Sequence, residues 1–229
     1  MNEFHELALE RLSAFRYAQL GELPRPLTPV AISRLAEALV VAATDKEFLD
    51  RTALISYRHV AGFDKIVLWQ GESFAKLTLH LWWNSNNAPV IAVPHTHRFS
   101  FLSVLLVGGI EYATFCSREA GTRRLEVDYT PHGDTATFLH QKRNVYLQVD
   151  KHVRISAPSA YYLRFQVPHL ILRTTSPAIS LVLRGPREQK TATVFPSSFA
   201  DLPASVPLYP IPPDKLSEKL RVVGTLLYE

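Results

Sequence analysis

The sequence places two histidines one residue apart, His95 and His97, within the stretch VIAVPHTHRFSFLSVLLVGG. Because side chains alternate between the two faces of a strand, these imidazoles point the same way, about 7 Å apart, with Thr96 opposite. Two imidazoles in this position can bind one metal ion when a third ligand comes from a neighbouring strand. His169, which opens the apolar run HLIL, is the expected third ligand.

Spacing alone does not name the ion, because imidazole binds iron, zinc, copper and nickel. An isolated His-x-His segment also has a simpler interpretation, as histidines of a packed core. Of the other six histidines, five are expected on the first helix, in loops or at strand ends. His80 lies inside a strand and is the one that a barrel interior could accommodate.

The elements that must position these histidines are β-strands. From about residue 53, short runs rich in β-branched and aromatic residues follow one another, separated by Gly, Pro, Asn and Asp. About a dozen strands at this spacing predict an antiparallel sandwich or barrel. Upstream, apolar residues recur at helical spacing, and Thr28 followed by Pro29 predicts the N-cap of a second helix. The last segment predicts a short helix capped by Asp214.

The predicted organisation is a helical segment over residues 1–50 that packs on the barrel, a β-barrel over residues 51–195, and a proline-rich tail with a short C-terminal helix over residues 196–229. At 229 residues, with 47% hydrophobic and 20% charged residues, the chain is expected to be soluble and globular. The formal net charge of +4 is scattered, so no nucleic acid is expected as a partner. A single cysteine, no signal-peptide pattern and no long apolar run predict a cytoplasmic protein without a membrane partner.

Around the histidines the sequence resembles the cupin superfamily. PHTHRFSFLSVLLVGG supplies the His-x-His and the later glycine of the first cupin motif, and VPHLIL supplies the single histidine of the second. The glutamate usual in the first motif is replaced, because Phe101 and Leu102 stand where it would be. The resemblance therefore implies a mainly β fold, a jelly-roll barrel with N-terminal α-helices, and three neutral metal ligands: His95, His97 and His169.

Within the cupins, a three-histidine site preceded by helices is similar to the cysteine dioxygenase-like thiol dioxygenases. SPAISLVLRGP resembles a strand downstream of that family's third ligand, and SYRHV resembles the strand whose arginine binds the substrate carboxylate, which makes Arg58 a candidate. The resemblance covers roughly residues 53 to 187. That family's cross-linked cysteine and tyrosine have no counterpart, because Leu102 and Arg184 occupy their places, so a thiol substrate is not implied.

Three neutral imidazoles leave a divalent ion with its full positive charge and with open coordination positions. An anionic substrate group is then expected to bind the ion directly, and iron(II) keeps a position for O₂. Arg58, Arg164 or Arg184 would hold the remote end, since a guanidinium binds carboxylate or phosphate through two parallel hydrogen bonds. Pairing of Arg184 with Glu188 is the equal alternative. Tyr162 is the candidate catalytic hydrogen-bond donor to oxygen at the metal.

The sequence thus predicts a mononuclear non-haem iron oxidoreductase, dioxygenase-like, that acts on a small anionic metabolite with O₂. Iron(II) is the expected cofactor, with zinc, manganese or nickel as alternatives. The competing hypotheses are a metal-dependent isomerase or lyase, and a non-enzymatic binding or sensor module. Because most cupins pair through strand edges, the resemblance also implies a homodimer. The aromatic residues expected to wall the cavity, or else to fill the core, are Phe99, Phe101, Tyr161 and Tyr162.

Overall fold

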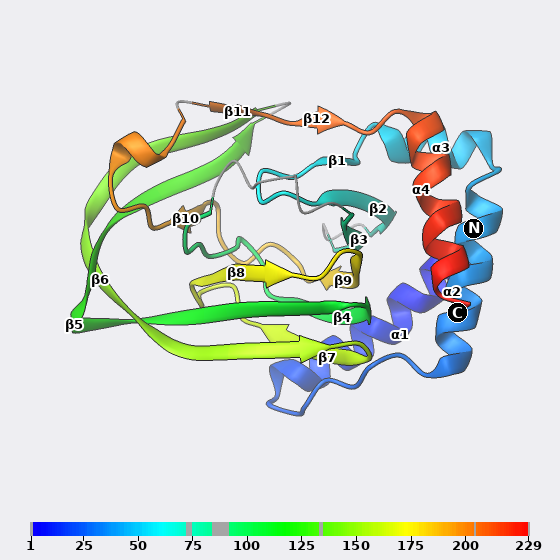
Figure 1. The fold of residues 1–229 in the computed structure, drawn as a ribbon, viewed down its shortest axis with the longest axis horizontal. Helices are drawn as coiled ribbons and strands as arrows, with labels where there is room; N and C mark the ends of the chain where they lie inside the picture. Colours follow the sequence, from blue (N-terminus) through cyan, green and yellow to red (C-terminus); the bar gives the residue numbers. More distant parts are fainter. Residues whose placement is uncertain (1, 72–74, 84–91, 133–134, 204, 229) are drawn as a thin grey trace.

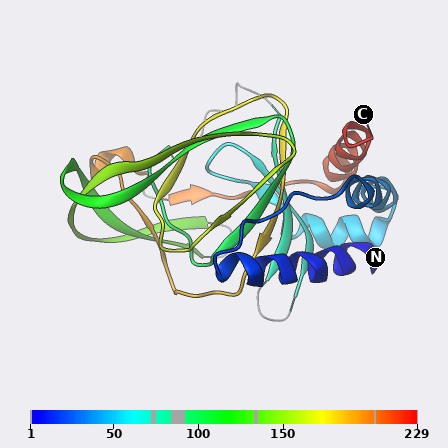
Figure 2. The same ribbon diagram turned by 90° about the horizontal axis from the view of Figure 1, so that it is seen from below.

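The computed structural model describes residues 2–71, 75–83, 92–132, 135–203 and 205–228. These residues form two antiparallel β-sheets and four α-helices, and the helices gather at one end of the molecule (Figure 1). Seen from below, helix α1 runs beneath the strands while the long green and yellow hairpin reaches away from the helices (Figure 2). None of the helices in this described part is long and apolar enough to cross a membrane.

The larger sheet has seven described strands in the order β12-β1-β2-β3-β9-β4-β7. Every neighbouring pair in it is antiparallel. Its strands are β1 (Tyr57–Arg58), β2 (Asp64–Gln70), β3 (Lys76–Trp82), β4 (Phe101–Val107), β7 (Ser159–Leu163), β9 (Ala178–Arg184) and β12 (Tyr209–Pro210).

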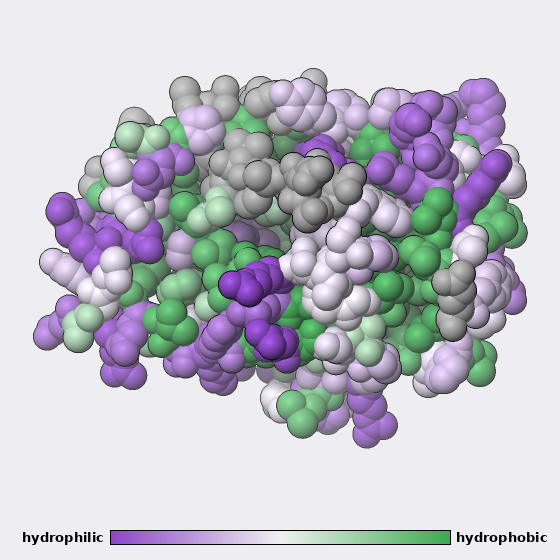
Figure 3. Space-filling model, viewed as in Figure 1, coloured by the Kyte–Doolittle hydropathy of each residue, from purple (hydrophilic) through white to green (hydrophobic). Residues whose placement is uncertain are grey.

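The smaller sheet has five described strands, β10-β5-β6-β11 in order, with β8 paired to β5. Strands β5 and β6 form one long hairpin, which bends at the left of Figure 1, and hydrophilic residues gather on that side of the molecule in Figure 3. The strands of this sheet are β5 (Gly109–His132), β6 (Thr135–Ser156), β8 (His169–Thr174), β10 (Ala192–Val194) and β11 (Ser205–Pro207).

The helices pack on the larger sheet only. Helix α1 (Asn2–Gln19) lies against β2, β3, β4, β7 and β9, and α3 (Lys46–Ala53) lies against β2. Helix α4 (Pro213–Leu226) packs on α2 (Pro29–Ala42) and α3, so the last helix joins the first three. A 3₁₀ turn, η1 (Phe199–Asp201), interrupts the segment between β10 and β11.

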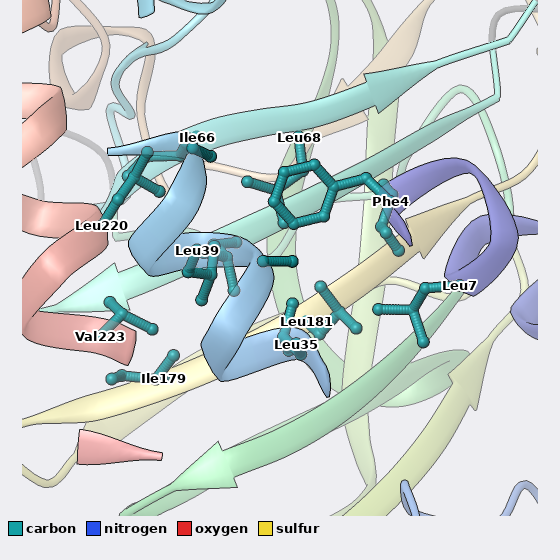
Figure 4. Close-up of a cluster of buried hydrophobic side chains, with 14 of the residues drawn as sticks. Phe4, Leu7, Leu35, Leu39, Ile66, Leu68, Ile179, Leu181, Leu220 and Val223 are labelled. Carbon is teal, nitrogen blue, oxygen red and sulfur yellow. The ribbon is translucent and has the colours of Figure 1, made fainter. Parts of the chain in front are cut away.

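The two faces of the larger sheet differ in chemistry. One face presents fully buried leucines and isoleucines from β2, β3 and β9, which pack against helices α1 to α4 (Figure 4). Burial of this apolar surface, at about 25 cal/mol for each Å², is the main stabilising contribution to the fold. The alternate residues, among them Lys65, Thr78, His80 and Arg184, face the smaller sheet. The period-2 alternation of the strands thus separates a hydrophobic core on the helix side from an interior between the sheets that combines polar and aromatic side chains.

The structure confirms the mainly β class and the helices that precede the strands. Helix α2 begins as predicted: the Thr28 hydroxyl accepts a hydrogen bond of 3.2 Å from the Ala31 backbone N–H, and Pro29 is the first helical residue. The predicted boundaries at residues 50 and 195 stay a prediction.

Two expectations about elements were wrong. Of the strand expected from Ala53, only Tyr57–Arg58 pairs as a strand, since Ala53 is the last residue of helix α3 and a turn follows it. Asp45 caps the start of this helix by accepting from the Phe48 N–H at 3.0 Å. The C-terminal helix begins at Pro213 after Pro212, with no side-chain cap, so Asp214 lies in its first turn. The described strands form two antiparallel sheets, and the closed jelly-roll barrel stays a prediction.

Candidate metal centre

Three imidazoles meet between the two sheets. The candidate ligand nitrogens of His95, His97 and His169 all lie within 4.8 Å of one another. The Nε2 atoms of His97 and His169 are 3.5 Å apart. An ion held at metal–nitrogen distances of about 2.0–2.1 Å needs ligand nitrogens about 3 to 3.4 Å apart, so small side-chain rotations suffice. The structure therefore brings together all three histidines that the sequence singled out; their binding of a metal stays a prediction.

Backbone hydrogen bonds hold the histidine segments in register. His95 and His169 exchange both of their backbone hydrogen bonds, at 3.0 and 2.9 Å, as the hydrogen-bonded pair of an antiparallel ladder does. Thr96 points the other way and is buried, with its N–H donating to the Thr193 carbonyl at 2.8 Å and its hydroxyl accepting from the Thr193 N–H at 2.9 Å. The two histidines at 95 and 97 consequently share one face.

All three imidazoles are held in the neutral form, which is the form that binds metal ions. Burial lowers the pKa of His95, and burial together with the neighbouring histidines lowers the pKa of His97 and His169 well below the ordinary value. The His95 Nδ1–H donates to the Val93 carbonyl at 3.1 Å, which leaves Nε2 as the lone-pair nitrogen. The donor set fits a divalent transition-metal ion, because three neutral nitrogens converge and their protonation is disfavoured.

The histidines border a cavity with two lobes, each of about 720 Å³ including its opening. The aromatic lobe contains all three histidines and is walled by Phe63, Trp82, Phe99, Phe101 and Tyr161. The cationic lobe contains His95 and His97 and is bordered by Tyr57, Lys65, Arg98, Tyr129 and Arg184. No aspartate or glutamate lines either lobe in the described part of the chain.

Of the three arginines considered from the sequence, the structure brings one to the cavity. Arg184, on β9, lines both lobes, and its guanidinium lies 4.5 Å from the centre of the Phe99 ring. Burial and the charge of Arg98 lower the pKa of Arg184 to about 10. Glu188, the alternative partner of Arg184 considered from the sequence, accepts hydrogen bonds of 2.9 and 2.6 Å from the backbone N–H and the hydroxyl of Ser100.

The other two arginines point elsewhere. Arg58 lies on β1 next to Tyr57, and because Tyr57 faces the cavity, Arg58 faces the helices and pairs with buried Asp64 at 3.4 Å. Arg164 is exposed just after β7 and lines neither lobe. The alternation of side chains along a strand decides both positions. The sequence could not show which residues of such short strands face the cavity.

The same alternation corrects the choice of tyrosine. Tyr162 faces the helix side, where its ring packs edge-on against Phe15 of α1 at 5.5 Å. Tyr161 faces the aromatic lobe, 6.0 Å from Phe101 between ring centres, and stacks on Tyr112 at 5.0 Å. Burial raises the pKa of Tyr161 to about 12, so its hydroxyl stays protonated and remains a hydrogen-bond donor. Tyr161, and not Tyr162, therefore lines the lobe that contains the three histidines.

Some cavity residues were missed from the sequence, among them His59 and Phe63. They form a stack with His80, the further histidine that the sequence allowed in the interior, at 4.5 and 4.4 Å between ring centres along one wall of the aromatic lobe. Burial lowers the pKa of both histidines well below the ordinary value. Lys65 was missed too, although a lysine in the apolar strand DKIVLWQ is a signal for a polar interior position.

No protein-family model matches this chain, and no curated protein matches it either. Among solved structures it overlaps in part with a chain described as "Crystal structures of DMSP lyases RdDddP and RnDddQII", at 16% identity and a TM-score of 0.32; the match covers 57% of this chain and about half, 51%, of the lyase chain. Hydroquinone 1,2-dioxygenase PnpCD, solved with Cd²⁺ and 4-hydroxybenzonitrile, gives 13% identity and a TM-score of 0.35, over 65% of this chain and 77% of the other. Procruciferin, an 11S globulin from Brassica napus, gives 11% identity and 0.30, over 67% and 33%. At TM-scores this low the overlap supports no conclusion about this chain, and its fold is defined by its own strand order.

Proposed function

We propose that the protein is a mononuclear non-haem iron oxygenase of the cupin type, dioxygenase-like, that acts on a small anionic metabolite. One observation supports this function above the others: three neutral imidazoles converge in a cavity that cations line and no described carboxylate enters. A site with three neutral ligands and cationic walls favours an anion, because charge neutralisation has to come from the substrate.

Each part of the cavity has a role in this proposal. His95, His97 and His169 hold iron(II), which supplies open coordination positions for the anionic group and for O₂. Arg184, stacked on Phe99, orients the substrate through charge-assisted hydrogen bonds. The aromatic lobe excludes water from the reacting atoms, as dry sites do in general.

The hydroxyl of Tyr161 is the proposed hydrogen-bond donor of the site. It faces the same lobe as the three histidines, and burial keeps it protonated. A donor placed where negative charge develops during a reaction stabilises that charge in a low-dielectric cavity.

A metal-dependent isomerase or lyase is the second candidate, and the His59–Phe63–His80 stack favours it. Both stacked imidazoles line the aromatic lobe and are neutral. A neutral imidazole next to the substrate is able to accept a proton, which isomerisation and elimination reactions require. An oxygenase has less need of two such bases.

The test is elemental analysis of the full-length protein purified without chelators, together with the His97→Ala variant. We expect about one iron per chain in the parent and loss of iron in the variant. The control is His152→Ala, because His152 is exposed, pairs with Glu111 and lines neither lobe of the cavity. Oxygen uptake with small organic acids then separates the two candidates, since a lyase or isomerase keeps its activity under strict anaerobiosis. A parent protein that binds no transition metal after reconstitution would overturn both.

A further inference from the structure

The cationic lobe collects more positive charge than a substrate with one acidic group needs. Arg98 directly follows a candidate metal ligand, Lys65 comes from β2, and Arg184 comes from β9. The larger sheet thus contributes two cations, and the histidine segment contributes one, to the same lobe of the cavity. No aspartate or glutamate among the described residues lines it.

The fold holds these cations firmly. The Arg98 carbonyl accepts backbone hydrogen bonds from Glu188 and Gln189, at 2.8 and 3.2 Å, so the backbone of the arginine is fixed. Lys65 lies in a continuous strand opposite Tyr57 on β1, and its Nζ is 5.6 Å from the centre of the Tyr57 ring. Arg184 is at the end of β9, with its guanidinium over Phe99. These side chains start from paired strands and a pinned turn, so the lobe is preorganised.

The arrangement carries an electrostatic cost without an anion. Burial, followed by the charges of Arg184 and Arg98, lowers the pKa of Lys65 to about 7. Burial, followed by the charges of Arg184, Lys65 and Arg98, also lowers the pKa of Lys76, which pairs with Arg184 across β3 and β9, to about 8. Like charges held together in a partly buried space destabilise the fold, and their repulsion is relieved when an anion binds between them.

The cationic lobe is also close to the histidines. The Arg184 guanidinium is 4.5 Å from the Phe99 ring centre, which is 5.4 Å from the His97 ring centre, so guanidinium and imidazole are separated by at most about 10 Å. That distance is spanned by a short molecule with an acidic group at each end.

We propose that the substrate carries two acidic groups, one directed at the three histidines and the other bound in the cationic lobe by Lys65, Arg98 and Arg184. This substrate class rests on the proposed function, because it takes the histidines as the metal-binding end of the cavity. The second group is a carboxylate or a phosphate, since both accept charge-assisted hydrogen bonds from lysine and arginine. Two acidic groups give each end of the cavity an anion, one for the histidines and one for the cations of the other lobe.

The experiment is isothermal titration calorimetry on the metal-loaded full-length protein under anaerobic conditions. The probes are glutarate, 2-phosphoglycolate and the single-acid control butyrate. We expect at least one of the two dianions to bind about tenfold or more tightly than butyrate, which corresponds to one or two additional charged hydrogen bonds. Which of the two binds more tightly distinguishes a carboxylate from a phosphate at the second position.

Variants assign the effect to the cationic lobe. Lys65→Met and Arg98→Met should each abolish most of the preference for dianions and leave butyrate binding within about twofold. Arg164→Met, an exposed arginine outside both lobes, should retain the full preference. Lys65→Gln and Arg98→Gln replace any methionine variant that does not fold.

Metal content measured on the same samples keeps the two proposals apart. A parent protein that binds no metal overturns the proposed function. One metal per chain together with equal affinities for butyrate and both dianions overturns only the substrate class. A preference that survives in both the Lys65 and the Arg98 variants likewise overturns it.

Discussion

Acidification below pH 6.5 should destabilise the protein through two imidazoles outside the metal cluster, His59 and His80. Burial lowers the pKa of both well below the ordinary 6.5, so the folded protein keeps them neutral where the unfolded chain takes up protons. Above pH 6.5 the two imidazoles are neutral in both the folded and the unfolded chain, so they contribute nothing to the pH dependence of the free energy of unfolding. Below it, proton uptake favours the unfolded chain, and stability is lost as the pH falls toward the folded pKa values.

The expected magnitude follows from proton linkage. An imidazole that stays neutral in the folded state costs about 1.4 kcal/mol one pH unit below 6.5, so His59 and His80 together account for about 3 kcal/mol at pH 5.5. This is a large share of the 5–15 kcal/mol typical of a whole domain. Carboxylates contribute little above pH 5.5, because they titrate about one unit lower or more.

Urea unfolding at pH 7.5 and 5.5 measures the effect, with the free energy of unfolding taken from the midpoint and slope. The change in stability between the two pH values should be about 3 kcal/mol smaller in the double variant His59→Gln/His80→Gln than in the parent. The three candidate ligand histidines are present in both proteins, so the comparison removes the part of their contribution that does not depend on His59 or His80. His5→Gln, on the exposed side of α1, is the control and should behave as the parent does. An identical pH dependence in the parent and the double variant would refute the reasoning.

Three further predictions follow from single positions. Gly108→Ala should lower the free energy of unfolding in urea by about 2–4 kcal/mol, because Gly108 has φ +75° and a Cβ there would overlap the turn before β9. In the control Gly109→Ala the added Cβ makes only ordinary contacts, so the loss should be much smaller. Equal losses in the two variants would contradict this prediction. Asp64→Ala should cost about 3–5 kcal/mol, because it leaves cations from β1 and α4 without their buried partner; a loss under 1 kcal/mol would show that the pairs contribute little. Tyr161→Phe should lower kcat about tenfold or more in oxygen-uptake assays, whereas Tyr162→Phe should leave it unchanged, and the reverse pattern would restore the choice made from the sequence.

The histidine cluster was accessible from the sequence because its information is local. His95 and His97 share a face wherever an extended segment carries them, and that inference needs no knowledge of pairing partners. His169 required one long-range step, which the cupin resemblance supplied and the exchange of backbone hydrogen bonds with His95 satisfies. The cap of α2 was likewise local, since Thr28 and Pro29 define the helix start by themselves.

The residues around the cluster were not accessible, because their positions depend on strand parity. In the pair Tyr161–Tyr162 either residue could face the interior, and only the register of β7 against β4 decides. For Arg58, the direction of the side chain depends on how the two-residue strand β1 pairs with β2 and with β12. Strand β12 lies more than a hundred residues further along the chain. A shift of one residue would have exchanged every inward side chain for an outward one.

The location of the main hydrophobic core explains how the interior of this sandwich can hold several charged and polar side chains. In many sandwiches the facing surfaces of the two sheets form the core, and charges between them would be costly. Here the outward face of the larger sheet, with Leu79 and Leu181 at 0 and 1% exposure, packs against four described helices and forms the main core. The inner face is therefore free to carry Lys65 and Arg184 next to three neutral imidazoles. The helices, none of whose described residues lines either lobe of the cavity, make the site possible by moving the stabilising apolar contacts to the other side of the sheet.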